Sequence, residues 1–221
     1  MLSRLFGKKT RVKRDHDRVW KTETLKLNGI MAHAAWLDKQ ATRVMMVTHF
    51  RQTYRALESL FHSRGIPYTP LISALDATRL LDPTTLQPGR VTLMHADLLP
   101  THHIRQVVER RECGFEVHLI VAEHHPLPSE DDRIMEFACA LPCTVRLCYH
   151  ESLDGALLKR FGGEQVGKLM SALHTPDTEA ITHASIDKAI RAAQEKLAKQ
   201  IETNRAGDTA DQWLQNNTPR G

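Results

Sequence analysis

The sequence is poor in cysteine and contains no long apolar run. Four cysteines among 221 residues do not make a disulfide framework, which favours a reducing, cytoplasmic compartment. No run of apolar residues approaches the length that spans a bilayer. The opening residues, MLSRLFGKK, lack the apolar region and the small-residue cleavage site of a signal peptide. We therefore expect a soluble, cytoplasmic globular protein.

The sequence also lacks an excess of positive charge beyond its N-terminus. Residues 1–14 hold six Lys and Arg and no acid, and the remainder has 24 basic against 26 acidic residues. Binding to nucleic acid is therefore not indicated. Three apolar residues of the basic segment fall on one helical face, and such a helix can lie in an anionic membrane interface. The predicted membrane-contact residues are Leu2, Leu5, Phe6, Lys8 and Lys9; the alternative is a solvated, disordered tail.

Two motifs of catalytic chemistry are absent. The sequence FGKKT at 6–10 is similar to the end of a phosphate-binding P-loop. A P-loop, however, requires Gly where Leu2 stands and Ser or Thr directly after Lys8. No Gly-x-Ser-x-Gly motif supports Ser-His-Asp chemistry. We predict no catalytic residues in this chain.

Up to about residue 150 the sequence alternates between strand-like and helix-like segments. Strands alternating with helices predict a parallel sheet with helices on both faces, an α/β fold. Ser129, with Asp132 three residues later, is a capping signal for a helix that starts there. The strand-like segments are 43–49, 67–72, 90–96, 116–123 and 144–150, and helix-like segments include 51–65 and 102–113.

After residue 150 the pattern becomes all-helical. The longest helical segment begins near Ser185 and carries a narrow apolar seam, which suits packing against a partner helix. The predicted partner-contact residues are Ile186, Ile190, Leu197 and Ile201. We divide the chain into a basic amphipathic tail (1–14), an α/β domain (15–150), a helical extension (151–205) and a flexible tail (206–221), in which Trp213 and Leu214 could dock.

Two long segments carry a family resemblance. DRVWKTETLKLNGIMAHAAWLDKQATRVMMVTHFRQTYRALESLF resembles the opening of the second nucleotide-binding domain of SecA, the preprotein-translocase ATPase. SLDGALLKRFGGEQVGKLMSALHTPDTEAITHASIDKAIRAAQEKL resembles the exit of that domain into the SecA scaffold helix. The resemblance covers roughly residues 15–201. It implies a RecA-like sheet of the helicase C-terminal type, and a membrane-contacting role for the N-terminus.

The sequence departs from this family where ATP would be handled. The loop HADLLPTHH after strand 90–96 keeps Asp97 but has none of the Gly and Arg expected there. The last motif of the family carries a glutamine and spaced arginines. Between Ile134 and Val145 there is no Arg, Gln or Gly, and Arg133 lies a turn or more too early. The apolar MEFACAL at 135–141 replaces that motif, so we expect this surface to pack against something.

Histidines gather after the strands. His49 follows strand 43–49 and precedes a helix, a natural anion site, although capping by Thr48 is favoured over catalysis. His102, His103, His124 and His125 could form a zinc site with Cys139 or Cys143. Their spacing fits no zinc signature, so buried cysteines without metal are favoured. His49, Asp97 and Arg133 remain as weak cofactor-binding candidates.

The retained fold beside the missing phosphate motifs predicts a non-catalytic, SecA-like module. Such a module would bind a protein partner at the cytoplasmic face of the membrane and would not bind ATP alone. Two alternatives remain open. The chain could be the second lobe of a split SecA-type ATPase completed by another chain, or it could be a nucleotide- or metal-sensing domain.

Overall fold

The chain folds around one parallel sheet flanked by helices. The computed structural model describes residues 11–40, 42–73, 82–100, 114–161, 163–201 and 203–218. Its seven-stranded sheet has the order β1-β7-β6-β3-β5-β4, with β2 also paired to β7. The pairs between these strands are all parallel. The strands are β1 Val12–Arg14, β2 Arg18–Trp20, β3 Arg43–Thr48, β4 Tyr68–Pro70, β5 Arg90–His95, β6 Glu116–Val121 and β7 Thr144–Ser152.

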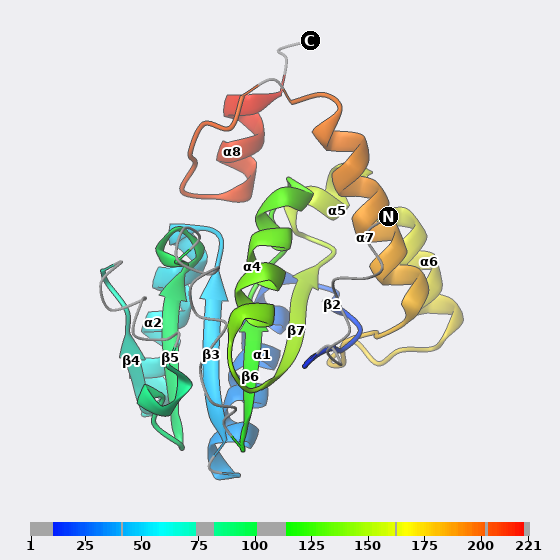
Figure 1. The fold of residues 1–221 in the computed structure, drawn as a ribbon. Coiled ribbons are helices and arrows are strands. Elements are labelled where there is room, and N and C mark those ends of the chain that lie inside the picture. The colour runs from blue at the N-terminus through cyan, green and yellow to red at the C-terminus, as the bar shows by residue number, and fades with distance from the viewer. Residues whose placement is uncertain are drawn as a thin grey trace.

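The central strands are apolar along their whole length because both faces of the sheet are covered. Alternate residues of β3 enter two different cores: Val44 and Met46 face helices α1 and α2, while Met45 and Val47 face α4. This is the pattern expected for a buried parallel strand. Figure 1 shows α1 and α2 on one side of the sheet and α4 on the other. The flanking helices are α1 Glu23–Lys39, α2 Arg51–Arg64 and α4 Pro128–Ala140.

The RecA-like α/β prediction is confirmed, and most predicted strands lie within a residue or two of their expected bounds. Helix α2 ends as expected, with Gly65 in the left-handed conformation at φ 62°. The structure corrects one local prediction. Helix α4 starts at Pro128, its N-cap is Leu127, and no side chain caps it. The fixed φ of proline suits the first helical position, so Ser129 lies inside the first turn.

The MEFACAL segment packs inside the chain. Phe137, Ala138 and Leu141 are buried in the core between α4 and the sheet. The apolar replacement of this motif therefore contributes to the fold's own core.

The helical extension forms most of a second core, to which Val19 and Phe50 also belong. The extension consists of α5 Ala156–Phe161, α6 Gly163–Ala172, α7 Ala184–Ala198 and α8 Ala210–Asn217. Ile186, Ile190 and Leu197 are at most 1% exposed and lie in this core, against which Ile201 packs partly buried. The seam on α7 is therefore covered by this chain's own helices, which corrects the interpretation of these residues as exposed partner contacts.

Both ends of the described chain are more ordered than expected. Val12–Arg14, placed in the basic tail, pairs with β7 as β1. The segment expected to be a flexible tail contains α8, with Trp213 and Leu214 buried. The predicted membrane-contact residues, the predicted helix 102–113 and the pair His102 and His103 lie outside the described residues. In the described ranges, no helix is both long and apolar enough to cross a membrane.

Candidate functional site

The carboxyl ends of β3 and β6 meet at the N-terminus of α2. Glu123, which follows β6, accepts hydrogen bonds from the backbone N–H groups of His49 and Phe50 at 2.8 and 3.0 Å, and from the hydroxyl of Thr53. A helix N-terminus favours negative charge and exposes free N–H groups, which is why phosphates bind there. Here a carboxylate of the chain itself occupies that position.

This arrangement corrects the prediction for Thr48. The N-cap of α2 is Phe50, which has no side-chain capping bond. The hydroxyl of Thr48 is buried and has no hydrogen-bond partner among the described residues. Glu123, more than seventy residues away in sequence, supplies the cap that we assigned to a local side chain.

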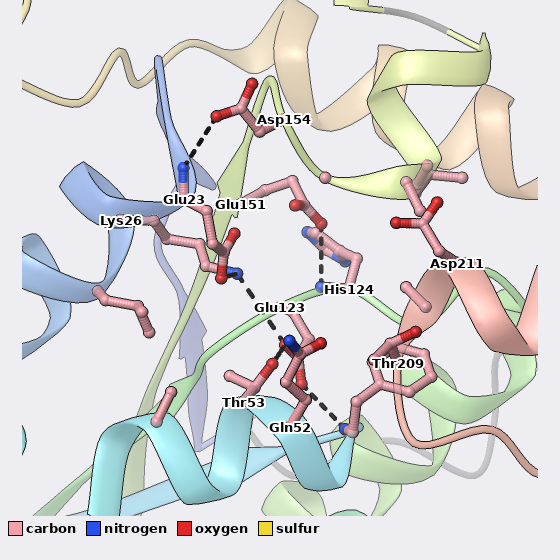
Figure 2. Close-up of a pocket in the computed structure, with 17 residues that line it drawn as sticks. Glu23, Lys26, Gln52, Thr53, Glu123, His124, Glu151, Asp154, Thr209 and Asp211 are labelled. Atoms are coloured by element: carbon pink, nitrogen blue, oxygen red, sulfur yellow. Dashed lines mark hydrogen bonds and ion pairs between the residues drawn. The ribbon is translucent and has the colours of Figure 1, made fainter. Parts of the chain in front are cut away.

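A cavity of about 220 Å³ opens beside Glu123, between α1, α2, α5 and α8. Figure 2 shows its side chains pointing toward one another from these elements. Five carboxylates line it among the described residues: Glu23, Glu123, Glu151, Asp154 and Asp211. Lys26, Gln52, Thr53 and Thr209 add polar groups to the wall.

Lys26 is a buried cation in the wall of this cavity. Its side chain is 2% exposed, and its Nζ lies 2.9 Å from Glu23 Oε1 and 4.0 Å from Glu123 Oε2. Burial acts to lower the pKa of Lys26, but Glu23, Glu123 and Glu151 outweigh it and raise that pKa above its usual value. Lys26 is therefore charged, and its charge is already compensated by the protein.

Glu151 is the least hydrated of the carboxylates. It accepts hydrogen bonds from the backbone N–H of Ser152 at 2.8 Å and of His124 at 3.3 Å. Burial raises the pKa of Glu151 above its usual value despite Lys26 nearby. Because Glu23, Glu123, Asp154 and Asp211 also line the cavity, it holds more negative than positive charge.

Behind the cavity, Asp131 of α4 joins four elements through one carboxylate. It accepts from His49 Nε2 at 2.9 Å, His124 Nδ1 at 2.6 Å, the backbone N–H of His125 at 3.1 Å and Gln194 Nε2 at 2.6 Å. Burial opposes its ionisation, but His124 and His49 hold the pKa of Asp131 well below its ordinary value. This network fixes α4 and α7 to the ends of β3 and β6.

His124 and His125 are adjacent but differ in charge. Burial acts to lower the pKa of His124, yet Asp17 and Asp131 raise it to about 10. Asp17 Oδ2 lies 3.2 Å from His124 Nε2. Burial, together with His49, lowers the pKa of His125 to about 3. At neutral pH His124 is therefore a buried cation between two aspartates, and His125 is neutral.

The three weak cofactor candidates line a second cavity. His49, Asp97 and Arg133 all border a space of about 370 Å³ at the same edge of the sheet. Asp97 lies on the surface, and a hydrogen bond from His95 lowers its pKa. Arg133 Nη1 is held by Glu130 Oε2 at 2.5 Å. The three candidates, which the sequence offered separately, therefore border one cavity.

The segment after α7 closes this second cavity. The Trp213 ring contacts that of His125 with centroids 4.9 Å apart, and the Trp213 Nε1–H donates to Asn204 Oδ1 at 2.9 Å. The backbone N–H of Gln52 donates to the carbonyl of Asp208 at 3.0 Å. In Figure 1, α8 (red) lies beyond the carboxyl ends of the strands. The expected flexible tail is a cover over the edge where ligands of α/β folds bind.

Sequence reasoning missed Asp17, Lys26, Glu123, Asp131 and Gln194. Their partners lie far apart in sequence, as with Gln194, which donates to the carbonyl of His125 at 2.7 Å. Glu123 directly precedes the paired histidines after β6, and this was the one signal in the sequence that could have pointed to the site. Cys139 is exposed on α4 and Cys143 is buried. In the described ranges, the group that could hold a metal is a different one: His33, Cys148 and His150.

Comparisons with known proteins identify relatives of one kind. No family model matches the chain. Protein translocase subunit SecA of Geotalea uraniireducens is 47% identical over 218 residues, covering 82% of this chain and 24% of that protein. The SecA of Christiangramia forsetii is 24% identical over 186 residues, covering 82% of this chain and 16% of that protein. The chain spans about a sixth of the length of SecA proteins such as those of C. forsetii and Salinibacter ruber.

Among solved structures, the C-terminal part of the Fun30 ATPase domain is similar with a TM-score of 0.42 and 14% identity, over 77% of this chain and 54% of that one. The sequence relatives carry the assignment. Over about four fifths of its length, the chain is a homologue of the protein translocase subunit SecA.

Proposed function

We propose that this chain is a SecA-like module that acts by binding protein and does not hydrolyse ATP. The observation that carries the proposal is the closure of the α2 N-terminus by Glu123. The backbone N–H groups of His49 and Phe50, which could hold a phosphate, already donate to that carboxylate. A phosphate could bind there only by displacing it.

The charge around Glu123 also opposes a nucleotide. Two unit charges 4 Å apart interact by about 4 kcal/mol at an effective dielectric constant of 20. The phosphates would face several carboxylates of the same sign, while the charge of Lys26 is taken up by Glu23 and Glu123. The cavity is better suited to a positively charged or neutral group.

The family motif that would supply an arginine to a transferring phosphoryl group is missing from its expected place in and after α4. Such an arginine is worth roughly 10³–10⁵ in rate. The segment from Ile134 to Val145 has none, and Arg133 is paired with Glu130. On this proposal, a chain that has neither this motif nor a P-loop neither binds nor hydrolyses ATP by itself. We accordingly assign it no ATP cofactor.

The partner is proposed from the relatives. Those proteins are named as translocase subunits, so the partner proposed here is a protein of the translocation machinery, met at the cytoplasmic face of the membrane. The basic residues of 1–14, together with Leu2, Leu5 and Phe6, would add contact with anionic lipid.

Two assays on purified protein test this function. Size-exclusion chromatography with light scattering, with and without purified SecA from the same organism, should show a complex. Steady-state ATP hydrolysis by the chain alone should equal that of buffer. A monomer that forms no complex with SecA, and that hydrolyses ATP, would refute the proposal.

The split-ATPase alternative is separated by a mixing experiment. The chain is added to a separately purified first nucleotide-binding lobe of SecA, and hydrolysis is followed. The proposal predicts no increase in rate; an increase that saturates at one chain per lobe supports the split enzyme. Co-sedimentation with anionic and neutral vesicles, comparing the natural chain with Leu5→Glu, tests the membrane contact.

A further inference from the structure

Three side chains that commonly bind transition metals meet between α1 and β7, apart from the cavities described above. His33 comes from α1, while Cys148 and His150 come from β7. One ligand atom from each lies within 4.8 Å of the others, and none of the three lines the carboxylate cavity. We propose that His33, Cys148 and His150 form a binding site for a zinc-class divalent transition metal ion.

The distances suit a tetrahedral ion. His33 Nδ1 and His150 Nε2 are 3.4 Å apart. With zinc–nitrogen bonds of about 2.0–2.1 Å, two nitrogens at a tetrahedral angle are separated by about 3.4 Å. Two imidazoles and one thiolate are a ligand set that selects zinc-class metals over magnesium or calcium. Three protein ligands leave a fourth position open for water.

The fold presents these residues on one face. Cys148 and His150 are two positions apart on β7, so their side chains project to the same side of the sheet. Cys148 and His150 are almost fully buried, whereas His33 is only partly buried. An ion could therefore enter from the His33 side. The thiol of Cys148 has only a weak contact, 3.8 Å to the carbonyl oxygen of Tyr149.

Trp20 holds His150 from the other side. Its indole stacks on the His150 ring with centroids 6.1 Å apart, and its Nε1–H donates to His150 Nδ1 at 3.2 Å. Gly29 of α1 makes room for this indole, since a Cβ there would lie 2.0 Å from Trp20 Cζ2. In the metal-free chain the proton of neutral His150 is therefore on Nε2, facing His33.

Metal binding moves two protons. The Nε2 of His150 must be free to bind the ion, so its proton transfers to Nδ1 and the Trp20 hydrogen bond breaks. The thiol of Cys148 binds as thiolate and releases its proton to solvent. Arg18 and Arg146 oppose a cation here, whereas Asp15 favours one.

Cobalt(II) and zinc(II) are the probes that test the site. Purified metal-free chain is titrated with Co²⁺, and Zn²⁺ is then added as competitor. We expect one ion per chain and a thiolate-to-cobalt charge-transfer band that Zn²⁺ removes. Cys148→Ser should abolish the band, and His33→Ala should weaken binding at least tenfold. Cys139→Ser and His62→Ala, at sites outside the cluster, should change neither.

Trp20→Phe gives a readout specific to this geometry. Removing the indole N–H ends its competition for His150 Nδ1, so Co²⁺ should bind on the order of tenfold more tightly. Circular dichroism verifies that each variant is folded. Absence of the cobalt band in folded natural protein at micromolar metal, or a band that persists in Cys148→Ser, overturns the site. Either result leaves the nucleotide question untouched, because the assay contains no nucleotide.

Discussion

Replacing Asp131 by asparagine should destabilise the fold more than any other single isosteric change at the candidate site. Asp131 is 7% exposed and accepts hydrogen bonds from His49, His124, His125 and Gln194. Asparagine keeps the shape but removes the charge. His124, a cation buried beside it, would then lose one of the two aspartates that pair with its ring and keep Asp17.

The magnitude follows from the burial of the pair. Breaking a buried ion pair by removing one partner typically costs about 3–5 kcal/mol, because the other charge is left uncompensated. For a domain of this size, each 1 kcal/mol corresponds to roughly 2–4 °C in Tm. Asp131→Asn should therefore lower the midpoint of thermal unfolding by roughly 6–20 °C.

The neighbouring residue provides the matched control. Asp132 lies on the exposed side of α4 and pairs with Arg191 at 3.0 Å, both side chains being well exposed. Exposed ion pairs contribute about 0–1 kcal/mol, so Asp132→Asn should change Tm by no more than about 4 °C. Urea unfolding followed by circular dichroism gives both free energies. Equal, small effects of the two substitutions would refute the account of Asp131 as the hub of a buried network.

Three further outcomes follow from the same structure. The pKa of His124 is raised to about 10, so the stability that its charge contributes is complete below about pH 6.5 and is lost as the pH rises through about 10. Urea unfolding from pH 7 to 10.5 should show this loss of stability. The substitution His124→Gln should make the loss smaller. Trp213→Ala should lower the free energy of unfolding by about 3–5 kcal/mol, because this 2%-exposed ring is packed in the second core. Trp36 is 55% exposed, so Trp36→Ala should change that free energy by no more than about 0.5 kcal/mol. Equal values for the two substitutions would contradict the docking of α8. Gly29→Ala should destabilise the fold by about 1–3 kcal/mol, because the added Cβ would collide with Trp20. A Cβ on Gly167 would have its nearest neighbour 4.0 Å away, so Gly167→Ala should stabilise α6 by up to about 1 kcal/mol. Thermal unfolding of both variants measures these opposite effects.

The sheet could be predicted from the sequence because its signals are local. A continuous apolar run such as 43–49 followed by the helical pattern of 51–65 is sufficient to place β3 and α2. The short strand Arg18–Trp20 has no comparable run, and it forms because Val19 and Trp20 pair with Glu151 and Ser152 of β7. Strands defined by a distant partner give no periodic signal of their own.

The site was only partly predictable for the same reason. His49 and Asp97 each follow a predicted strand, whereas Arg133 lies inside α4, and its place at the same cavity could not be derived from strand ends. The role of Glu123 could not be derived either, because a cap supplied from another strand cannot be read from residues next to the helix. Thr48 had the right residue type, yet its buried hydroxyl has no hydrogen-bond partner in the part of the chain that the structure describes. The α7 seam was correctly interpreted as apolar, but it is buried within this chain, where α5 packs against α7.

We propose that the chain's own carboxylates close the edge of the sheet to nucleotide. A thermal-shift titration with Mg-ATP and Mg-ADP, up to millimolar concentration, tests this most directly. A ligand at 100 times its Kd stabilises a fold by about 2.7 kcal/mol, which for this chain is a shift of roughly 5–11 °C. The account predicts no shift in the natural chain, in which Glu123 occupies the N-terminus of α2. A saturable shift with either nucleotide would contradict it and would show that a nucleotide site persists in this SecA homologue.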